Sequence, residues 1–215
     1  MAQVVIAARG GCGAKSRCAD ALDGPRRAAL TAAMLEDMLD TIARCQAVMR
    51  TWVVTPTAEL ADLAARRGAR PIAQIGEAGL NAAFGQAIAE VSERAPYDPV
   101  MLLPGDLPLL EPDDLARAVL LVQTHAVVLA PAWDGGTGLL GLRAGAAFEP
   151  AFGADSFSRH AAQAAQRGLS VSVLTAGSLS RDIDRPEDFA RVVEHAPATL
   201  TGAFLRARMQ AQPRP

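Results

Sequence analysis

The strongest constraint on the fold is the alternation of short apolar segments with amphipathic helices along almost the whole chain. The segment Gln3–Ala8 is a short apolar run typical of a buried strand. The next long segment, Pro25–Cys45, carries Leu30, Met34 and Met38 at helical spacing. Repeated alternation predicts an α/β fold, a three-layer α/β/α arrangement around a mainly parallel, twisted sheet with right-handed crossovers. Ligands of such sheets bind outside the carboxyl ends of the strands.

The remaining elements follow the same order. We expect strands at 52–55, 70–73, 100–103, 126–130, 139–143 and 171–174, and helices at 57–67, 80–93, 112–122, 156–167 and 186–194. Thr57 is expected to cap the second helix, and Asp184 to begin the last one. The length of 215 residues suits one domain over residues 1–196, followed by a C-terminal tail, 197–215, that has room for a short helix.

Composition narrows the class of protein. The net charge is −2 and half of the residues are hydrophobic, as in globular proteins. The chain has no basic run of the kind that binds nucleic acid, and no apolar run long enough for a signal peptide or a membrane span. Cys12, Cys18 and Cys45 are odd in number and lack paired spacing, so we expect reduced thiols in a cytoplasmic protein. A monomer and a homodimer both remain open.

A glycine-rich basic loop, Arg9–Arg17, follows the first strand. Of the chain's 21 Lys and Arg residues, only Lys15 is a lysine, which makes it a candidate for a position where a compact ammonium is needed; its chance survival is the alternative. Gly11 and Gly13 lack Cβ atoms and let backbone N–H groups approach a phosphate. The loop matches neither the P-loop nor the GxGxxG pattern. It therefore indicates phosphate binding of another kind, or a plain flexible loop.

Carboxylates occur at two other strand ends. Asp106 lies between Pro104 and Pro108, directly after an apolar strand, where rigid flanks suit a carboxylate that holds a hard cation. Asp182 and Asp184 are two residues apart and point the same way in an extended chain. A turn role for Asp106 and a capping role for Asp184 are the structural alternatives, and capping by Asp184 is compatible with a metal role for Asp182.

Two further loops carry groups suited to ligands. The segment Gly79–Asn81 opens a helix with backbone N–H groups and an amide that can read a base or ribose, unless Asn81 only caps the helix. Thr137, together with Gly153 and Ser156, places hydroxyls and glycine amides at a helix start, which is an arrangement that binds anions.

Together and in this order, the segments resemble the 2-phospho-L-lactate guanylyltransferase family of coenzyme F-420 biosynthesis, which includes relatives that use phosphoenolpyruvate or 3-phosphoglycerate. The resemblance runs from Val4 to about Val193. Its pieces are AKSR at 14–17, MLEDML at 34–39, VVTP at 53–56, GLNAA at 79–83, LPGDLPLL at 103–110, the TG loop at 137–138, FGADSFSRH at 152–160 and DIDRPEDF at 182–189. The LPGDLP and DIDRPED pieces also occur in other nucleotidyltransferases, whereas AKSR, GLNAA and FGADSFSRH together are more specific.

The resemblance implies a nucleotide-diphospho-sugar transferase-like (Rossmann-like) fold and a guanylyltransferase that moves GMP from GTP to a small phosphorylated carboxylic acid, releasing pyrophosphate. It also implies Mg²⁺, for which Mn²⁺ can substitute. The implied catalytic residues are Lys15, Arg17 and Asp106, and the implied metal ligands are Asp106, Asp182 and Asp184. The implied nucleotide-binding residues are Gly11, Gly13, Lys15, Thr55, Gly79, Leu80 and Asn81, and the implied acceptor-binding residues are Thr137, Gly153 and Ser156.

The chain departs from the family pattern at two places. Residues 7–9 read Ala-Ala-Arg where the family usually has Pro-Val-Lys, and Gly138 stands where it usually has Asn. Gly138 removes an amide donor and is expected to open volume, which favours a longer acceptor such as 3-phosphoglycerate. The alternatives are another nucleotidyltransferase of the same fold, such as a molybdopterin cytidylyltransferase, a nucleotide-sugar glycosyltransferase that uses Asp182 and Asp184, and a regulatory nucleotide binder without catalysis.

Overall fold

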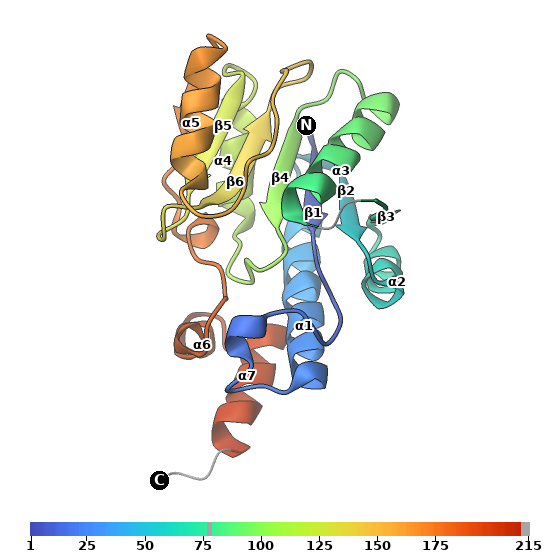
Figure 1. Ribbon diagram of the computed structural model, residues 1–215, viewed down its shortest axis with the longest axis vertical. Helices are drawn as coiled ribbons and strands as arrows, with labels where there is room; N and C mark the ends of the chain where they lie inside the picture. Colours follow the sequence, from blue (N-terminus) through green and yellow to red (C-terminus); the bar gives the residue numbers. More distant parts are fainter. Residues whose placement is uncertain (77–78, 212–215) are drawn as a thin grey trace.

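The computed structural model describes residues 1–76 and 79–211, which form a seven-stranded sheet with helices on both faces (Figure 1). The strands are β1 (Ala2–Ala7), β2 (Val48–Thr55), β3 (Arg70–Ala73), β4 (Val100–Pro104), β5 (Val127–Pro131), β6 (Thr137–Leu142) and β7 (Val171–Val173). The helices are α1 (Gly24–Ala43), α2 (Ala58–Arg66), α3 (Leu80–Arg94), α4 (Pro112–Leu121), α5 (Ser156–Gln166), α6 (Phe189–His195) and α7 (Leu200–Ala211). Among these helices, none combines the length and apolarity that a membrane span requires.

The sheet is mainly parallel, as the alternation predicts. Its strand order is β3-β2-β1-β4-β6-β5-β7, and only β6 runs antiparallel to its neighbours β4 and β5. The turn between β5 and β6 spans five residues, 132–136, which is too short for the crossover that a parallel pair needs. The carboxyl ends of β1, β2, β3 and β4 therefore meet at one edge of the sheet.

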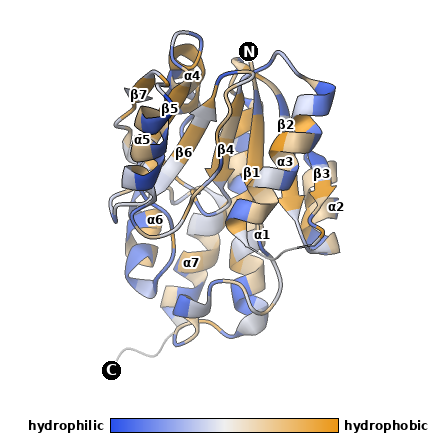
Figure 2. Ribbon diagram, turned by 45° about the horizontal axis from the view of Figure 1, so that its top comes forward, coloured by the Kyte–Doolittle hydropathy of each residue, from blue (hydrophilic) through white to orange (hydrophobic). Residues whose placement is uncertain are grey.

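Alternate residues of each central strand enter opposite core layers. In β1, Val4 and Ile6 pack with α1, α2 and α4, whereas Val5 and Ala7 pack with α3 and α5. The apolar colouring of the strands between the helix layers is visible in Figure 2. This burial on both faces explains why the strands read as continuous apolar runs rather than as alternating patterns.

A third apolar cluster joins the two ends of the chain below the sheet. It contains Cys18, Leu22, Leu30, Met34, Ile183, Phe189, Val192 and Leu205. Helix α7, in the segment predicted as a tail, packs against α1 and α6, and residues 212–215 of that tail lie outside the described residues. The buried carboxylate of Asp37 in α1 accepts the backbone N–H groups of Leu200 (2.9 Å) and Thr201 (2.8 Å) and so caps α7.

Because Asp37 is the capping acceptor, Asp37→Asn is expected to lower the free energy of unfolding by about 1–3 kcal/mol, the range for losing charge-assisted hydrogen bonds at a helix start. Urea denaturation measures the change. Asp40→Asn, on the same helix, removes only a partly exposed ion pair with Arg67 and is the control, with an expected loss below about 1 kcal/mol. Equal losses in the two variants would show that Asp37 does not cap α7.

Candidate active site

A cleft of about 470 Å³ lies at the sheet edge where the carboxyl ends of β1 to β4 meet. Its lining comes mainly from the ends of β1 to β4 and the loops that follow them, with contributions from α1, from the start of α3 and from Asp184. The lining residues are 7–9, 13–16, Thr31, Val54, Pro56, Gln74, Gly76, Gly79, Leu80, Ala83, Pro104–Asp106 and Asp184. The cleft is thus built from the same strand-end loops in which the sequence placed its phosphate and metal candidates, as expected for an open α/β sheet.

The glycine-rich loop is held in shape by one arginine. The guanidinium of Arg27 in α1 donates to the carbonyls of Cys12 (2.6 Å), Ala14 (3.0 Å) and Leu22 (2.7 Å). Lys15 sits in this loop with a left-handed backbone (φ 49°), a conformation that non-glycine residues adopt at a cost of about 1–3 kcal/mol when the surroundings enforce it. These hydrogen bonds hold the loop in one conformation, which argues against the plain flexible loop considered from the sequence.

The Lys15 ammonium bridges two carboxylates from distant parts of the chain. Its Nζ lies 2.7 Å from Asp106 Oδ2 and 3.0 Å from Asp184 Oδ1. Arg17 pairs with the other oxygen of Asp184 from the solvent side. Burial alone would lower the pKa of Lys15, but the charges of Asp106 and Asp184 outweigh it and raise that pKa above its ordinary value, so the ammonium stays charged.

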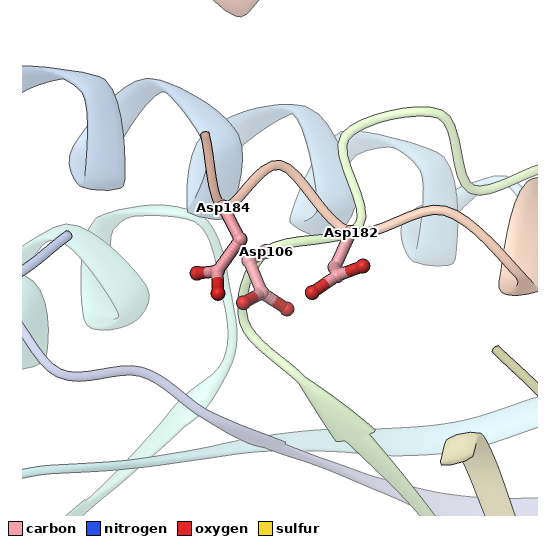
Figure 3. Close-up of side chains that lie close together, drawn as sticks. All are labelled: Asp106, Asp182 and Asp184. Atoms are coloured by element: carbon pink, nitrogen blue, oxygen red, sulfur yellow. The ribbon is translucent and has the colours of Figure 1, made fainter. Parts of the chain in front are cut away.

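Asp106, Asp182 and Asp184 converge on one point, as Figure 3 shows. One carboxylate oxygen of each lies within 4.8 Å of the others, close enough to hold one metal ion. The second oxygen of Asp106, Oδ1, is buried and has no hydrogen-bond partner in the described part of the chain. An orphaned buried carboxylate oxygen is costly unless it is paired, and three oxygen donors suit a hard divalent cation. The residues therefore fit a metal.

One backbone hydrogen bond and the side chain of Asp188 bring the carboxylates together. The N–H of Ile183 donates to the carbonyl of Asp106 at 3.0 Å, and the Ile183 side chain is buried in the third apolar cluster. The flanking Asp182 and Asp184 side chains consequently point the other way, toward Asp106. Asp188 accepts the N–H groups of Asp184 (3.0 Å) and Arg185 (2.9 Å), which stabilises the segment from its other end.

The expectation that Asp184 begins the last helix is wrong. A 3₁₀ turn over Pro186–Asp188 precedes α6, its N-cap residue is Arg185, and Asp188 reaches back to satisfy the free N–H groups. Asp184 is instead occupied by Lys15 and Arg17. Charge-assisted hydrogen bonds to Lys15 and Arg17 stabilise the Asp184 carboxylate more than hydrogen bonds at a solvent-exposed helix start would. These ion pairs therefore determine where the side chain points.

The two carboxylates of the 182–184 segment titrate in opposite directions. Burial, with the negative charges of Asp106 and Asp184, raises the pKa of Asp182 to about 6. Burial would also raise the pKa of Asp184, but Lys15 and Arg17 outweigh it and lower that pKa below its ordinary value. Asp182 is thus the acid of the cluster that forms no ion pair within the described residues, and a divalent cation would supply the missing positive charge.

The predicted nucleotide-binding residues divide into two groups. Gly13, Lys15, Gly79 and Leu80 line the cleft, whereas Gly11, Thr55 and Asn81 do not. Thr55 is buried, and its hydroxyl accepts the N–H of Thr57. The side-chain amide of Asn81 binds the backbone of Phe152 through both of its ends, accepting the N–H at 2.7 Å and donating to the carbonyl at 3.1 Å.

Asn81 therefore does not cap α3, and both ends of its side-chain amide are engaged by the backbone of Phe152. It fastens α3 to the loop before α5, and the helix N-cap is Gly79, which has a φ of 127°. Arg9 and Gln74 line the cleft without having been predicted from the sequence. Their only sequence signal is their position at the carboxyl ends of β1 and β3.

The three predicted acceptor residues lie outside this cleft. Thr137 and Ser156 are buried, and the Ser156 hydroxyl donates to Thr137 Oγ1 at 3.0 Å. His160 Nε2 accepts the N–H of Ala151 at 2.9 Å, which leaves the proton on Nδ1 to donate to Thr137 Oγ1 at 3.0 Å. The hydroxyls thus bind one another, and Gly153, with a φ of 121°, stays exposed at the loop surface.

The expectation that Gly138 opens volume for an acceptor is wrong. A Cβ atom at this position would lie 1.6 Å from the carbonyl oxygen of Leu179, so the space is filled by the backbone of the 3₁₀ turn Gly177–Leu179. That turn is fixed by Ser178, which donates to the buried Asp114 at 2.6 Å. Gly138 is required for close backbone approach, and a Gly138→Asn variant would test stability rather than acceptor choice.

This fold, with a lysine and three carboxylates at the carboxyl ends of its parallel strands, belongs to the nucleotidyltransferase class, as its structural neighbours and sequence relatives show. A crystal structure of a protein from Desulfovibrio desulfuricans G20, assigned to the nucleotide-diphospho-sugar transferases, superposes with a TM-score of 0.80 at 20% identity, covering 98% of this chain and 96% of that one. The likeness shows the fold.

Sequence relatives specify the family. The family described as "Guanylyl transferase CofC like" matches residues 2–214, and the chain belongs to it. A 3-phospho-D-glycerate guanylyltransferase of Phenylobacterium zucineum (strain HLK1) is 51% identical over 99% of this chain and 100% of its own length. A phosphoenolpyruvate guanylyltransferase of Sphaerobacter thermophilus (strain ATCC 49802) is 37% identical over 86% of this chain and 88% of its own. The resemblance stated from the motifs is confirmed.

Because Lys15 already neutralises two of the carboxylates that a divalent cation would bind, Asp106 and Asp184, Lys15→Gln is expected to tighten the binding of Mn²⁺ to the nucleotide-free protein by at least about tenfold, or about 1.4 kcal/mol. Isothermal titration calorimetry measures the dissociation constant. Arg17→Gln removes an exposed cation that contacts only Asp184 and should change the binding less. Weaker Mn²⁺ binding by Lys15→Gln would contradict the shared occupancy.

Burial lowers the pKa of His160 from 6.5 to about 4, with a smaller contribution from Arg159. A neutral imidazole is required because Nε2 must accept a hydrogen bond. This histidine therefore contributes stability above pH 6.5 that is lost as the pH falls through 4, up to about 3 kcal/mol. Urea denaturation at pH 7 and pH 4.5 should show a smaller loss in His160→Gln than in the wild-type protein. Equal losses would mean that the pKa of His160 is not lowered in the folded protein.

Proposed function

We propose that the protein transfers GMP from GTP to a small phosphorylated carboxylic acid and releases pyrophosphate, as a step of coenzyme F-420 biosynthesis. The observation that carries the proposal is the Lys15–Asp106–Asp184 cluster at the nucleotide edge of the sheet, in a chain that matches a guanylyltransferase along its full length. All three cysteines are free thiols, which supports a cytoplasmic location.

The reaction needs no general base from the protein. An oxygen of the acceptor's phosphate, already anionic, bonds to the α-phosphorus of GTP, and the bond from that phosphorus to the bridging oxygen of the β-phosphate breaks. Lys15, with Arg17 beside it, holds the triphosphate and stabilises the charge that develops on it. The loop amides from Gly13 to Ser16 hold phosphate oxygens.

The carboxylates are the proposed metal ligands. Asp106, Asp182 and Asp184 would hold Mg²⁺, or Mn²⁺ in its place, and the ion would neutralise the phosphates and orient them for in-line attack. In the nucleotide-free protein, Lys15 compensates the charge of Asp106 and Asp184. When the triphosphate arrives, the ammonium exchanges these carboxylates for phosphate oxygens. The site then keeps a balanced charge in both states.

The acceptor we propose is 3-phosphoglycerate. The support is the 51% identical relative that carries this acceptor in its name, and no longer the volume expected at Gly138. Phosphoenolpyruvate, named for the 37% identical relative, and 2-phospho-L-lactate are the competing acceptors. The predicted acceptor-side residues remain Thr137, Gly153 and Ser156. Because the hydroxyls of Thr137 and Ser156 bind one another, we propose that these residues act by shaping the loop whose backbone contacts the acceptor.

The proposal is tested by pyrophosphate release with four nucleotides and three acceptors. GTP with 3-phosphoglycerate should give a kcat/KM at least as high as GTP with phosphoenolpyruvate or 2-phospho-L-lactate, because this ratio reports transition-state binding. Preference for CTP would favour the cytidylyltransferase alternative. Transfer of a sugar without release of pyrophosphate would favour the glycosyltransferase alternative. Binding of a nucleotide without turnover would favour a regulatory protein.

Asp106→Asn removes a charge from the centre of the carboxylate cluster and should lower metal-dependent kcat by at least about 100-fold. Steady-state pyrophosphate release across a Mg²⁺ titration provides the measurement. Asp113→Asn, an exposed acid in the first turn of α4, is the matched control and should retain full activity. Undiminished turnover of Asp106→Asn, or of the wild-type protein in excess chelator, would assign the cluster a structural role.

A further inference from the structure

A second cleft lies behind the loops that carry the metal-site carboxylates. Its volume is about 740 Å³. One wall is Pro108–Glu111, which follows Asp106, and another includes Arg181, which precedes Asp182. The ends of α1 and α6 and the segment 196–199 complete it. None of the roles proposed above uses this cleft.

The lining of this second cleft carries an excess of positive charge. Three arginines, Arg44, Arg181 and Arg191, reach it from three different segments, and His195 joins them. The two acids in its wall are Glu111 and Asp114. Asp114 is already neutralised, because Ser178 donates to Oδ2 at 2.6 Å and Arg117 to Oδ1 at 3.1 Å. The arginines that line this cleft outnumber the acids of its wall and leave donors for an external anion.

Arg191 is the clearest sign of a missing partner. Its Nη1 is buried and makes no hydrogen bond within the described residues. The nearest carboxylate oxygen of its ion pair, Asp188 Oδ1, is 4.0 Å away. The other oxygen of Asp188 is committed to the N–H groups of Asp184 and Arg185, so that carboxylate stays with the metal-site segment. A buried guanidinium donor without an acceptor costs about 1–3 kcal/mol, which a bound anion would recover.

We propose that this second cleft binds a small phosphate-bearing anion, held by Arg44, Arg181 and Arg191. Phosphate fits better than a carboxylate, because its oxygens accept donors from several directions, as three guanidiniums from separate segments require. His195 lines the same cleft, and its Nδ1 donates to the carbonyl of Arg191 at 2.9 Å, which orients the ring beside this arginine. The anion would lie against both loops that position the metal ligands, outside the nucleotide cleft.

Titration calorimetry of the metal-free full-length protein with inorganic phosphate tests the proposal. We expect one saturable site, weakened at least about tenfold by Arg191→Gln and by Arg44→Gln. Arg66→Gln removes the same charge from the exposed surface of α2 and should leave binding unchanged, as should Lys15→Gln in the nucleotide cleft. Acetate should bind more weakly than phosphate.

Parallel titrations with glycerol 3-phosphate identify the preferred form of the ligand. Tighter binding of inorganic phosphate would indicate a site for the free ion, and tighter binding of glycerol 3-phosphate a site for a phosphomonoester. Absence of saturable phosphate binding to the wild-type protein would overturn the proposal. So would phosphate binding that survives Arg191→Gln and Arg44→Gln but is lost in Lys15→Gln, because the nucleotide cleft would then be the site. Since binding is read without GTP or an acceptor, the result does not depend on the proposed transferase activity.

Discussion

The Lys15 ammonium between Asp106 and Asp184 is the interaction on which the geometry of the active site depends. It joins residues separated by 91 and 169 positions in the chain. Without a cation, three carboxylates with oxygens within 4.8 Å of one another would repel, and burial would drive them toward protonation. Lys15 prevents this for two of them. Asp182, which it does not contact, has the raised pKa expected of the acid left over.

Besides the exposed ion pair of Arg17 with Asp184, the surrounding structure holds these charges through hydrogen bonds to the backbone. Arg27 binds two carbonyls of the glycine-rich loop and the carbonyl of Leu22. Ile183 binds the carbonyl of Asp106, and Asp188 binds the N–H groups of the 184–185 segment. Loops fastened in this way pay their ordering entropy during folding, before any ligand arrives. Positioning of this kind is what nucleotidyl transfer requires from a protein, because the nucleophile and the leaving group are supplied by the substrates.

The two clefts are connected by polar contacts through the segment that carries Asp184. Arg191, Asp188 and Asp184 form a chain of polar contacts from one cleft to the other. The 108–111 segment separates the clefts on the other side. The loops that carry the carboxylate cluster therefore contribute walls to both clefts, as does helix α1, and any coupling between the clefts would pass through these shared elements.

The amino-acid sequence by itself determined the three-layer fold, because strands buried on both faces and amphipathic helices leave a periodic signal at short range. It also determined the chemistry of the centre: a lone lysine in a glycine-rich loop, an aspartate between prolines, and an Asp-Ile-Asp segment are local patterns. The tertiary structure alone decided which polar groups remain available to a ligand. Asn81, Thr137 and Ser156 have suitable side chains, yet each is bound to a partner that lies at least 19 positions away. Gly138 has no side chain, and the space that a side chain would occupy is filled by the backbone of Leu179, 41 positions further along the chain. Hydrogen-bond pairing between distant segments has no short-range signal, so these assignments required the fold.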